Sequence, residues 1–382
     1  MKISKRVEQM KPSGIRAFFE LVLNMKDVIS LGVGEPDFVT PWNIRETAIY
    51  ALEQGQTSYT SNKGMLELRK QISLFLRQRY GLSYDPQEEI LITVGVSEAY
   101  DLALRALINP GDSILVPEPS YVSYFPIVSL AGGKPLSIHT DIRDSFKVTV
   151  QKLRTAYVRG TKGFVINYPA NPTGTSYTKK ELQAISKFII EKDLVVVSDE
   201  VYDELTYDRK HVPFPTLPGM KSRTVYLNGF SKAYAMTGFR IGYACGPKRI
   251  IQAMTKIHQY TMLCASIMSQ LAAQEALKNS MKSVEQMRKE YRRRREFIVD
   301  GLNAVGLPCH KPDGAFYVFP SIQNTGFDSL TFAQELLKKK KVALVPGTAF
   351  GPSGEGYVRI AYAASFDSLK ESLQRIAEFL KR

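Results

Sequence analysis

The feature that most constrains this chain is an alternation of short β-branched runs with amphipathic stretches through its middle. Strands that alternate with helices are typical of an α/β domain with a mainly parallel sheet. Several of the runs are continuously apolar, as expected for strands covered on both faces. Helices are predicted between them over residues 98–108, 179–191 and 248–260. The seven predicted strands are residues 90–94, 113–117, 135–139, 163–167, 194–198, 224–228 and 241–245.

The last hundred residues follow a different pattern, which predicts a second, smaller α+β domain. A long charged helix is predicted over residues 281–304, followed by helices at 329–339 and 366–380. Short strands are predicted at 315–319, 342–345 and 357–362. At roughly 100–200 residues per domain, a chain of 382 residues has room for two or three domains. We therefore predict an N-terminal segment (1–44) packing with the small domain, a large domain (45–282) and a small C-terminal domain (283–382).

The charge balance favours anionic ligands but does not by itself indicate nucleic acid. Lysine and arginine number 51 against 37 aspartate and glutamate, a net charge of +14. The densest basic runs, 292–295 and 338–341, lie in predicted helices and are interpreted as solvated helix faces. Cys245, Cys264 and Cys309 show no metal-ligand spacing, so no metal site is expected. No apolar run reaches the ~18 residues of a membrane span, and a cytoplasmic protein without membrane or nucleic-acid partners is expected.

Two cationic residues follow the predicted strand 224–228. A lysine in an apolar or cationic pocket, such as Lys232, can have a lowered pKa and form a Schiff base with a carbonyl compound. Arg240, eight residues later, could bind a phosphate group bidentately. The alternative is a solvent-exposed lysine and an arginine at a helix end.

Polar residues also follow the predicted strands 163–167 and 194–198, where ligands bind in open parallel sheets. Asp199 could keep a pyridine nitrogen protonated, and Tyr202 could hydrogen-bond a phenolic oxygen. The alternative is an aspartate that caps a helix and a tyrosine that packs in the core. Asn171, in the segment 171–174, is also consistent with a simple turn.

Three further positions have both a binding and a structural interpretation. The turn with Val96 and Ser97 could bind an anion at a helix N-terminus, or Ser97 could simply cap that helix. Tyr121 could lie on a planar cofactor or belong to the core. Arg359, in the apolar strand 357–362, needs either an anionic ligand or a structural salt bridge.

Together these segments resemble the pyridoxal-phosphate-dependent aminotransferases of classes I and II, over nearly the whole chain. The order and spacing of these segments are most similar to those of the branch that includes aspartate, alanine, aromatic and N-acetyl-diaminopimelate aminotransferases. It implies fold type I, with a large domain built on a mainly parallel seven-stranded sheet and a smaller α+β domain. The matching segments are 32–38, 58–60, 171–174 and 199–202, together with Ser231, Lys232, Arg240 and Arg359.

The resemblance also implies roles for individual residues. Lys232 would form the Schiff base with pyridoxal 5'-phosphate and move the proton, while Asp199 would pair with the pyridinium nitrogen. Tyr202 and Asn171 would bind the phenolate oxygen, and Tyr121 would stack on the ring. The implied phosphate contacts are Val96, Ser97, Ser231, Arg240 and, from a neighbouring subunit, Tyr59. The implied substrate contacts are Arg359 for the α-carboxylate, with Gly34, Asn171 and Ile15 nearby.

The implied activity is a ping-pong transfer of an amino group from an amino acid to a 2-oxo acid, with 2-oxoglutarate as acceptor. The implied enzyme is a homodimer with shared active sites. The donor could be alanine, aspartate or an aromatic amino acid; Ser97 stands where one acidic-substrate branch carries a lysine, which favours the others. One alternative is a pyridoxal-phosphate-dependent β-lyase acting on cystathionine or cysteine. A remote alternative is a DNA-binding regulator, although segment 32–38 begins too early to leave room for a DNA-binding domain.

Overall fold

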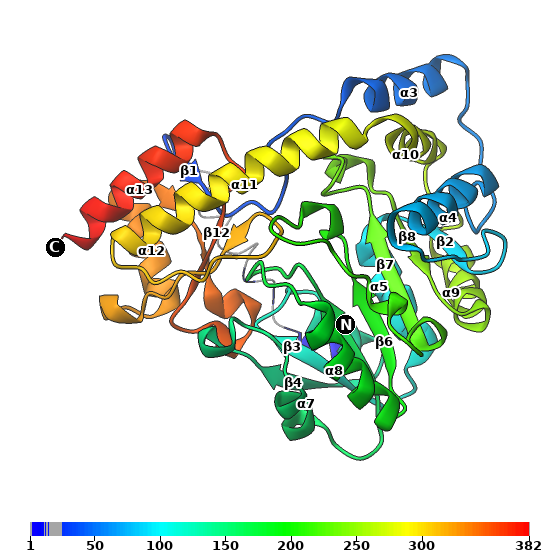
Figure 1. Ribbon diagram of the computed structural model, residues 1–382, viewed down its shortest axis with the longest axis horizontal. Coiled ribbons are helices and arrows are strands. Elements are labelled where there is room, and N and C mark those ends of the chain that lie inside the picture. The colour runs from blue at the N-terminus through cyan, green and yellow to red at the C-terminus, as the bar shows by residue number, and fades with distance from the viewer. Residues whose placement is uncertain (1, 11, 13, 15–24, 382) are drawn as a thin grey trace.

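The computed structural model, which describes residues 2–10, 12, 14 and 25–381, contains one seven-stranded sheet with helices on both faces (Figure 1). The strand order is β2-β8-β7-β6-β5-β3-β4. Strand β8 is antiparallel to both of its neighbours, and every other pair is parallel. The strands are β2 (Ile90–Thr93), β3 (Ser113–Glu118), β4 (Lys134–His139), β5 (Thr161–Asn167), β6 (Val195–Asp199), β7 (Thr224–Gly229) and β8 (Gly242–Cys245).

The central strands are buried on both faces, which explains their continuous apolar runs. In β5, Val165 packs in the cluster formed with α5 (Gly95–Leu107) and α9 (Lys248–Thr261). Its neighbours Phe164 and Ile166 pack in the cluster formed with α8 (Lys179–Glu191) on the opposite face. Successive side chains of a strand point to opposite faces, so a strand between two helical layers must be apolar at every position.

All seven predicted strands are present in this sheet, and helix α8 has the predicted bounds. Helix α5 begins at Gly95, three residues before the prediction, and its N-cap residue is Val94. The alternative that Ser97 caps this helix is therefore wrong, because Ser97 lies inside the first turn. The Glu98 carboxylate instead accepts a hydrogen bond from the Val94 N–H at 2.5 Å.

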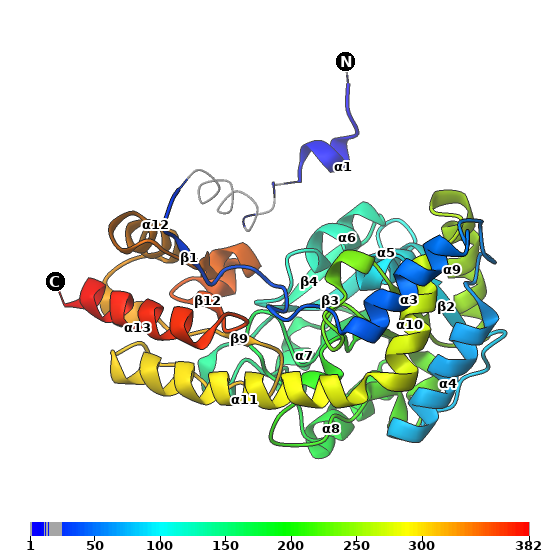
Figure 2. The same cartoon turned by 90° about the horizontal axis from the view of Figure 1, so that it is seen from above.

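The C-terminal part is built around short strands and three helices, α11 (Met281–Ala304), α12 (Ser329–Lys340) and α13 (Phe366–Leu380). Figure 2 shows α11 extending from α10 (Ile267–Asn279) to lie beside α13. Strands β11 (Val345–Pro346), β12 (Val358–Ala361) and β9 (Tyr317–Val318) form an antiparallel sheet. Strand β1 (Ile29–Ser30) pairs in parallel with β10 (Val342–Ala343).

The prediction of one strand over residues 342–345 is wrong. Val342 and Ala343 pair with β1, whereas Val345 and Pro346 pair with β12. The chain changes partner at Leu344 because the N-terminal segment supplies a second strand, which the local sequence pattern does not reveal. The remaining α-helices of the described residues are α1 (Lys5–Glu8), α3 (Trp42–Glu53), α4 (Leu66–Tyr80), α6 (Tyr124–Leu130) and α7 (Val150–Ala156).

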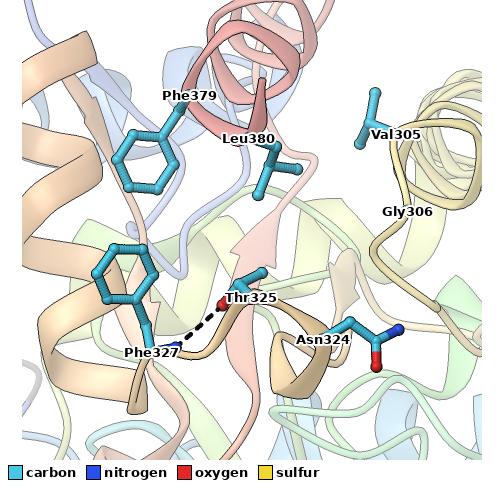
Figure 3. Close-up of a pocket in the computed structure, with 7 residues that line it drawn as sticks. All are labelled: Val305, Gly306, Asn324, Thr325, Phe327, Phe379 and Leu380. Atoms are coloured by element: carbon cyan, nitrogen blue, oxygen red, sulfur yellow. Dashed lines mark hydrogen bonds between the residues drawn. The ribbon is translucent and has the colours of Figure 1, made fainter. Parts of the chain in front are cut away.

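Within the described residues, none of the helices combines the length and apolar character that a membrane crossing requires. A pocket of about 260 Å³ lies at the end of the C-terminal part, between the last turns of α11 and α13 (Figure 3). It has no charged lining residue and includes none of the predicted site residues, so it is not the catalytic centre. Its lining is Val305, Gly306, Asn324, Thr325, Phe327, Phe379 and Leu380.

Candidate active site

The predicted site residues follow the carboxyl ends of parallel strands. These ends share one edge of the sheet, because only β8 runs against the other strands. Tyr121 follows β3, Asn171 follows β5, Asp199 ends β6, and Lys232 follows β7. This is the edge at which open α/β sheets bind ligands.

Lys232 is partly buried, and its Nζ donates a hydrogen bond to the backbone carbonyl of Gly34 at 2.7 Å. Burial lowers the pKa of this amine to about 8, and the positive charges of Arg359 and Arg240 act in the same direction. The alternative of a solvent-exposed lysine is therefore wrong. A lysine with such a pKa has a sizeable neutral fraction near neutral pH, as condensation with an aldehyde requires.

Asp199 is buried, with 6% of its surface exposed, and accepts two hydrogen bonds. The Tyr124 hydroxyl donates to Oδ2 at 2.7 Å, and the Val201 N–H donates to Oδ1 at 3.2 Å. Burial raises the pKa of the carboxyl to about 6, although both hydrogen bonds lower it. Asp199 caps no helix, since the next helical turn begins at Asp203, so the capping alternative is wrong. The other half of that alternative is confirmed, because Tyr202 packs in the core. The carboxylate can therefore pair with a cationic ring nitrogen at the strand end.

Arg359 is a fully buried guanidinium that no carboxylate among the described residues neutralises. One terminal nitrogen donates to Asn171 Oδ1 at 3.0 Å and the other to the Gly32 carbonyl at 2.5 Å. Its Nε has no hydrogen-bond partner in the described structure, and burial lowers the pKa of the group. Among the described residues, the alternative of a structural salt bridge is therefore wrong. A buried charge without a counter-ion indicates a binding site for an anion.

Asn171 connects this guanidinium to the strand ends. Its backbone N–H donates to Asn167 Oδ1 at 3.0 Å, and Asn167 Nδ2 donates to the Asp199 carbonyl at 2.8 Å. Asn171 also belongs to a turn in which Gly174 has a φ of +68°, so the turn interpretation is confirmed, and the binding role stays a prediction. Arg359 and Asp199 are joined through Asn171 and Asn167 by one hydrogen-bonded chain.

At the predicted phosphate site, Arg240 lies against the N-terminus of α5. Gly95, at a φ of +75°, leaves room for this approach, because a Cβ there would lie 2.6 Å from an Arg240 guanidinium nitrogen. Arg240 follows a short helical turn, as its structural alternative proposed, and donates to the Thr237 carbonyl at 2.9 Å. Val96 and Ser97 lie in the first turn of α5. A cation beside free helix N–H groups is suited to bind phosphate.

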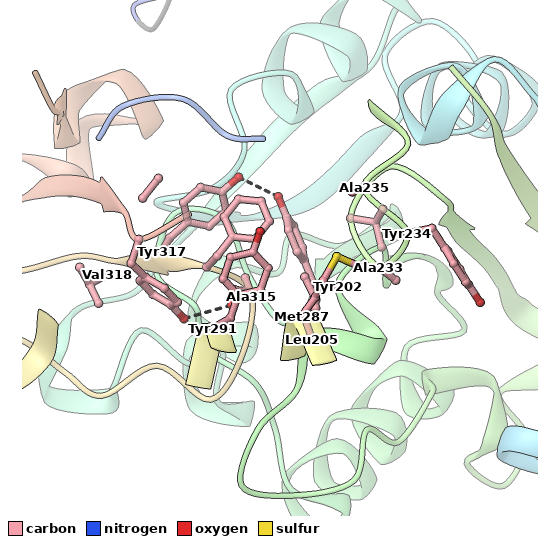
Figure 4. Packing of buried hydrophobic residues seen from close by; sticks show 14 of the residues in the cluster. Tyr202, Leu205, Ala233, Tyr234, Ala235, Met287, Tyr291, Ala315, Tyr317 and Val318 are labelled. Carbon is pink, nitrogen blue, oxygen red and sulfur yellow. Dashed lines mark hydrogen bonds between the residues drawn. The ribbon is translucent and has the colours of Figure 1, made fainter. Parts of the chain in front are cut away.

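Tyr202 is buried and its hydroxyl shares a hydrogen bond of 2.9 Å with that of Tyr317 (Figure 4). The Lys232 Nζ lies 5.9 Å from the centre of the Tyr202 ring. Tyr317 and Tyr124 were not predicted from the sequence. Tyr124 lies three positions after Tyr121, a spacing that places both near one strand end, whereas no local pattern marks Tyr317.

Four predicted positions are less closely joined to this group. Tyr121 is half-buried, with its ring centre 5.6 Å from that of Tyr124, and Ser231 is buried beside Lys232 in the chain. Tyr59 is 83% exposed, so its contribution to a neighbouring subunit stays a prediction. Ile15 lies outside the described residues.

The residues present fit pyridoxal 5'-phosphate. The cofactor requires an amine for its aldehyde, a carboxylate for its ring nitrogen and cationic or N–H groups for its phosphate. The lowered pKa of Lys232, the buried Asp199 and the position of Arg240 over Gly95 meet these three requirements. Arg359, which no carboxylate among the described residues neutralises, has the charge needed to bind the carboxylate of a substrate.

Comparison with known proteins agrees with this geometry. Residues 26–378 match the family described as aminotransferase class I and II. The chain is 45% identical over 384 residues to an aspartate aminotransferase of Pyrococcus abyssi, covering 100% of this chain and 99% of the relative. It is 42% identical over 384 residues to aromatic-amino-acid aminotransferase 2 of Thermococcus litoralis, with the same coverage.

The fold is also shared with solved structures. An aspartate aminotransferase of Thermus thermophilus, solved with maleate, superposes with a TM-score of 0.95 at 38% identity, over 99% of both chains. A family match over most of the sequence and full-length relatives at this identity establish the family. The chain therefore belongs to the class I and II aminotransferases and is a pyridoxal-phosphate-dependent transaminase.

Proposed function

We propose that this enzyme transfers the amino group of a small, apolar or aromatic amino acid to 2-oxoglutarate. The observation that carries the proposal is the buried Arg359, which lacks a carboxylate partner among the described residues and so is available to a substrate carboxylate. Bound pyridoxal phosphate supplies an electron sink for the electron pair left when the Cα–H bond breaks. The relatives reported above are aminotransferases by name, which does not favour the β-lyase or the DNA-binding regulator.

Arg359 and Asn171 orient the substrate. Arg359 binds the α-carboxylate, and Asn171 fixes the guanidinium through its 3.0 Å hydrogen bond. With the carboxylate held, the Cα–H bond rather than the bond to the carboxylate is placed for cleavage. This orientation favours proton transfer over decarboxylation.

Lys232 moves the proton. Its Nζ accepts the proton from the substrate Cα, which requires the neutral amine, and a pKa of about 8 makes that form accessible. The ionised Asp199 would keep the ring nitrogen of the cofactor protonated, and Tyr202 with Asn171 would bind its phenolate oxygen. We assign Val96, Ser97, Ser231 and Arg240 to the phosphate, Tyr121 to the ring face, and Gly34 and Ile15 to the substrate side.

A panel of amino acids tests the donor proposal. Each is mixed with the pyridoxal-phosphate-loaded enzyme, and the loss of the cofactor's visible absorbance is followed for the first half-reaction. Alanine and phenylalanine should react faster than aspartate, because Ser97 brings no positive charge to the position where an acidic-substrate branch carries lysine. A reaction with aspartate alone would contradict the proposal.

The same panel in Arg359→Lys tests the carboxylate site. The kcat/KM for amino acids should fall by about 30-fold or more, because disrupting a buried charge pair costs ~2–5 kcal/mol. The wild-type preference for alanine over alaninamide should fall with it, since the amide lacks the carboxylate. An unchanged preference would show that Arg359 does not bind this group.

The Tyr124 hydrogen bond should set the acid limit of activity. Tyr124→Phe removes a donor to the ionised carboxylate, so the pKa of Asp199 rises above its value of about 6. The acid limb of the kcat/KM profile should therefore move to higher pH by ~1 unit. Tyr100→Phe is the control: its hydroxyl donates to the Tyr124 carbonyl at 3.1 Å, and its loss should leave the limb in place. If the acid limb of the kcat/KM profile did not move in Tyr124→Phe, the proposal that activity requires the ionised Asp199 would be refuted.

We propose a homodimer in which Tyr59 reaches the phosphate of the neighbouring site. Several large apolar side chains are exposed in the single chain, among them Trp42 at 57%, Tyr50 at 58% and Tyr260 at 87%. A subunit interface would cover such side chains. Sedimentation equilibrium should give twice the chain mass of 42.9 kDa, and Trp42→Glu should weaken the association. A fully active monomer would contradict the shared site.

We also propose the domain division 1–44, 45–282 and 283–382, and a cytoplasmic location that cell fractionation would test. The pairing of β1 with β10 supports the attachment of the N-terminal segment to the small domain. Helix α11 begins at Met281 and extends from α10 into the C-terminal part, which supports the second boundary. Limited proteolysis with mass spectrometry would map the boundaries directly.

A further inference from the structure

Tyr317 joins the small sheet to the cofactor side of the site. Its backbone lies in β9, where it pairs with Ala361 of β12, the strand that carries Arg359. Its hydroxyl meets that of Tyr202, which follows β6 of the large sheet, at 2.9 Å. Both side chains are buried, with 1% and 3% of their surfaces exposed. The contact is therefore a water-excluded hydrogen bond between the two sheets (Figure 4).

The direction of this hydrogen bond follows from donor counting. A tyrosine hydroxyl has one proton to donate and lone pairs to accept. If Tyr202 donates its proton to an anionic oxygen, only Tyr317 can be the donor in the pair. A hydroxyl that accepts a hydrogen bond becomes a stronger donor itself, and more so in a low-dielectric interior. Tyr317 would then strengthen the hydrogen bond that Tyr202 makes.

Tyr317 is also packed against the groups that hold the substrate and the lysine. The Arg359 guanidinium carbon lies 4.6 Å from the centre of the Tyr317 ring. A Cβ at position 34 would lie 2.8 Å from the Tyr317 hydroxyl oxygen and 3.9 Å from an Arg359 nitrogen. Residue 34 is glycine, and its carbonyl accepts the Lys232 hydrogen bond. The position of the Tyr317 hydroxyl is therefore fixed by close neighbours.

We propose that Tyr317 is a positioning residue that donates to the Tyr202 hydroxyl and strengthens its hydrogen bond to the phenolate oxygen of the cofactor. Its ring, packed under Arg359, gives the carboxylate site and the phenolate site a common support. This inference rests on the proposed role of Tyr202.

The test is the pH titration of the visible absorbance of the pyridoxal-phosphate-loaded enzyme. The titrating proton is shared by the lysine nitrogen and the phenolate oxygen, so weaker stabilisation of the phenolate raises the midpoint. Tyr317→Phe keeps the ring over which Arg359 packs and removes only the hydroxyl. We expect the midpoint to rise by ~0.3–1 pH unit, the value of one neutral hydrogen bond, and by less than in Tyr202→Phe.

A double-mutant comparison separates this role from a general effect. In the Tyr202→Phe background, Tyr317→Phe should not move the midpoint further. Tyr362→Phe is the matched control, because this buried hydroxyl donates to the Ala315 carbonyl at 3.0 Å, away from Tyr202; its midpoint should equal that of the wild type.

Two results would overturn the role proposed for Tyr317 while leaving the role of Tyr202 in place. One is a midpoint that moves in Tyr202→Phe but not in Tyr317→Phe. The other is an equal effect of Tyr317→Phe with and without the Tyr202 hydroxyl, which would show that Tyr317 acts by another route. A midpoint unmoved in Tyr202→Phe would instead refute the proposed role of Tyr202, and the inference with it.

Discussion

The structure depends on a positive charge that is buried without a negative partner among the described residues. The Arg359 guanidinium is surrounded by an amide oxygen, a backbone carbonyl and the rings of Tyr317 and Phe350, the second of which lies 4.9 Å from its central carbon. Desolvating such an ion costs several kcal/mol unless a counter-ion compensates. In the proposed function, the substrate carboxylate would be that counter-ion, and binding it would offset the cost of burying the guanidinium. The same unmatched charge helps to lower the pKa of Lys232.

Buried carboxylates, in contrast, are concentrated at the end of β6 and in the segment that follows it. Four carboxylates are buried within six residues: Glu204 pairs with the cationic Arg79 at 2.7 Å, and Glu200 lies 2.5 Å from the Nε2 atom of His211. Asp203 accepts hydrogen bonds from Tyr80 and Asn228 instead, each at 2.8 Å. Asp199 likewise has only neutral donors, and it ends its strand at the edge that carries Lys232. It is therefore the carboxylate suited to pair with a cationic ring.

The local sequence predicts where the helices and strands of this fold lie better than it predicts which segments pair with one another. Continuous apolar runs reveal the seven strands, and helix α8 is bounded by a capping box at Thr178 and Glu181. The hydrogen bonds that complete the site join residues 75 positions apart (Tyr124–Asp199) and 115 positions apart (Tyr202–Tyr317). Such pairs follow from strand order and from the packing of two sheets, which no local period encodes. The same reason explains why the two partners of segment 342–346 were not predicted.

The most direct test of the account is the covalent position of the cofactor. The enzyme is loaded with pyridoxal 5'-phosphate, reduced with borohydride, digested and analysed by mass spectrometry. The account predicts one modified peptide with the pyridoxyl group on Lys232. A modification on any other lysine, or none in an active preparation, would contradict it.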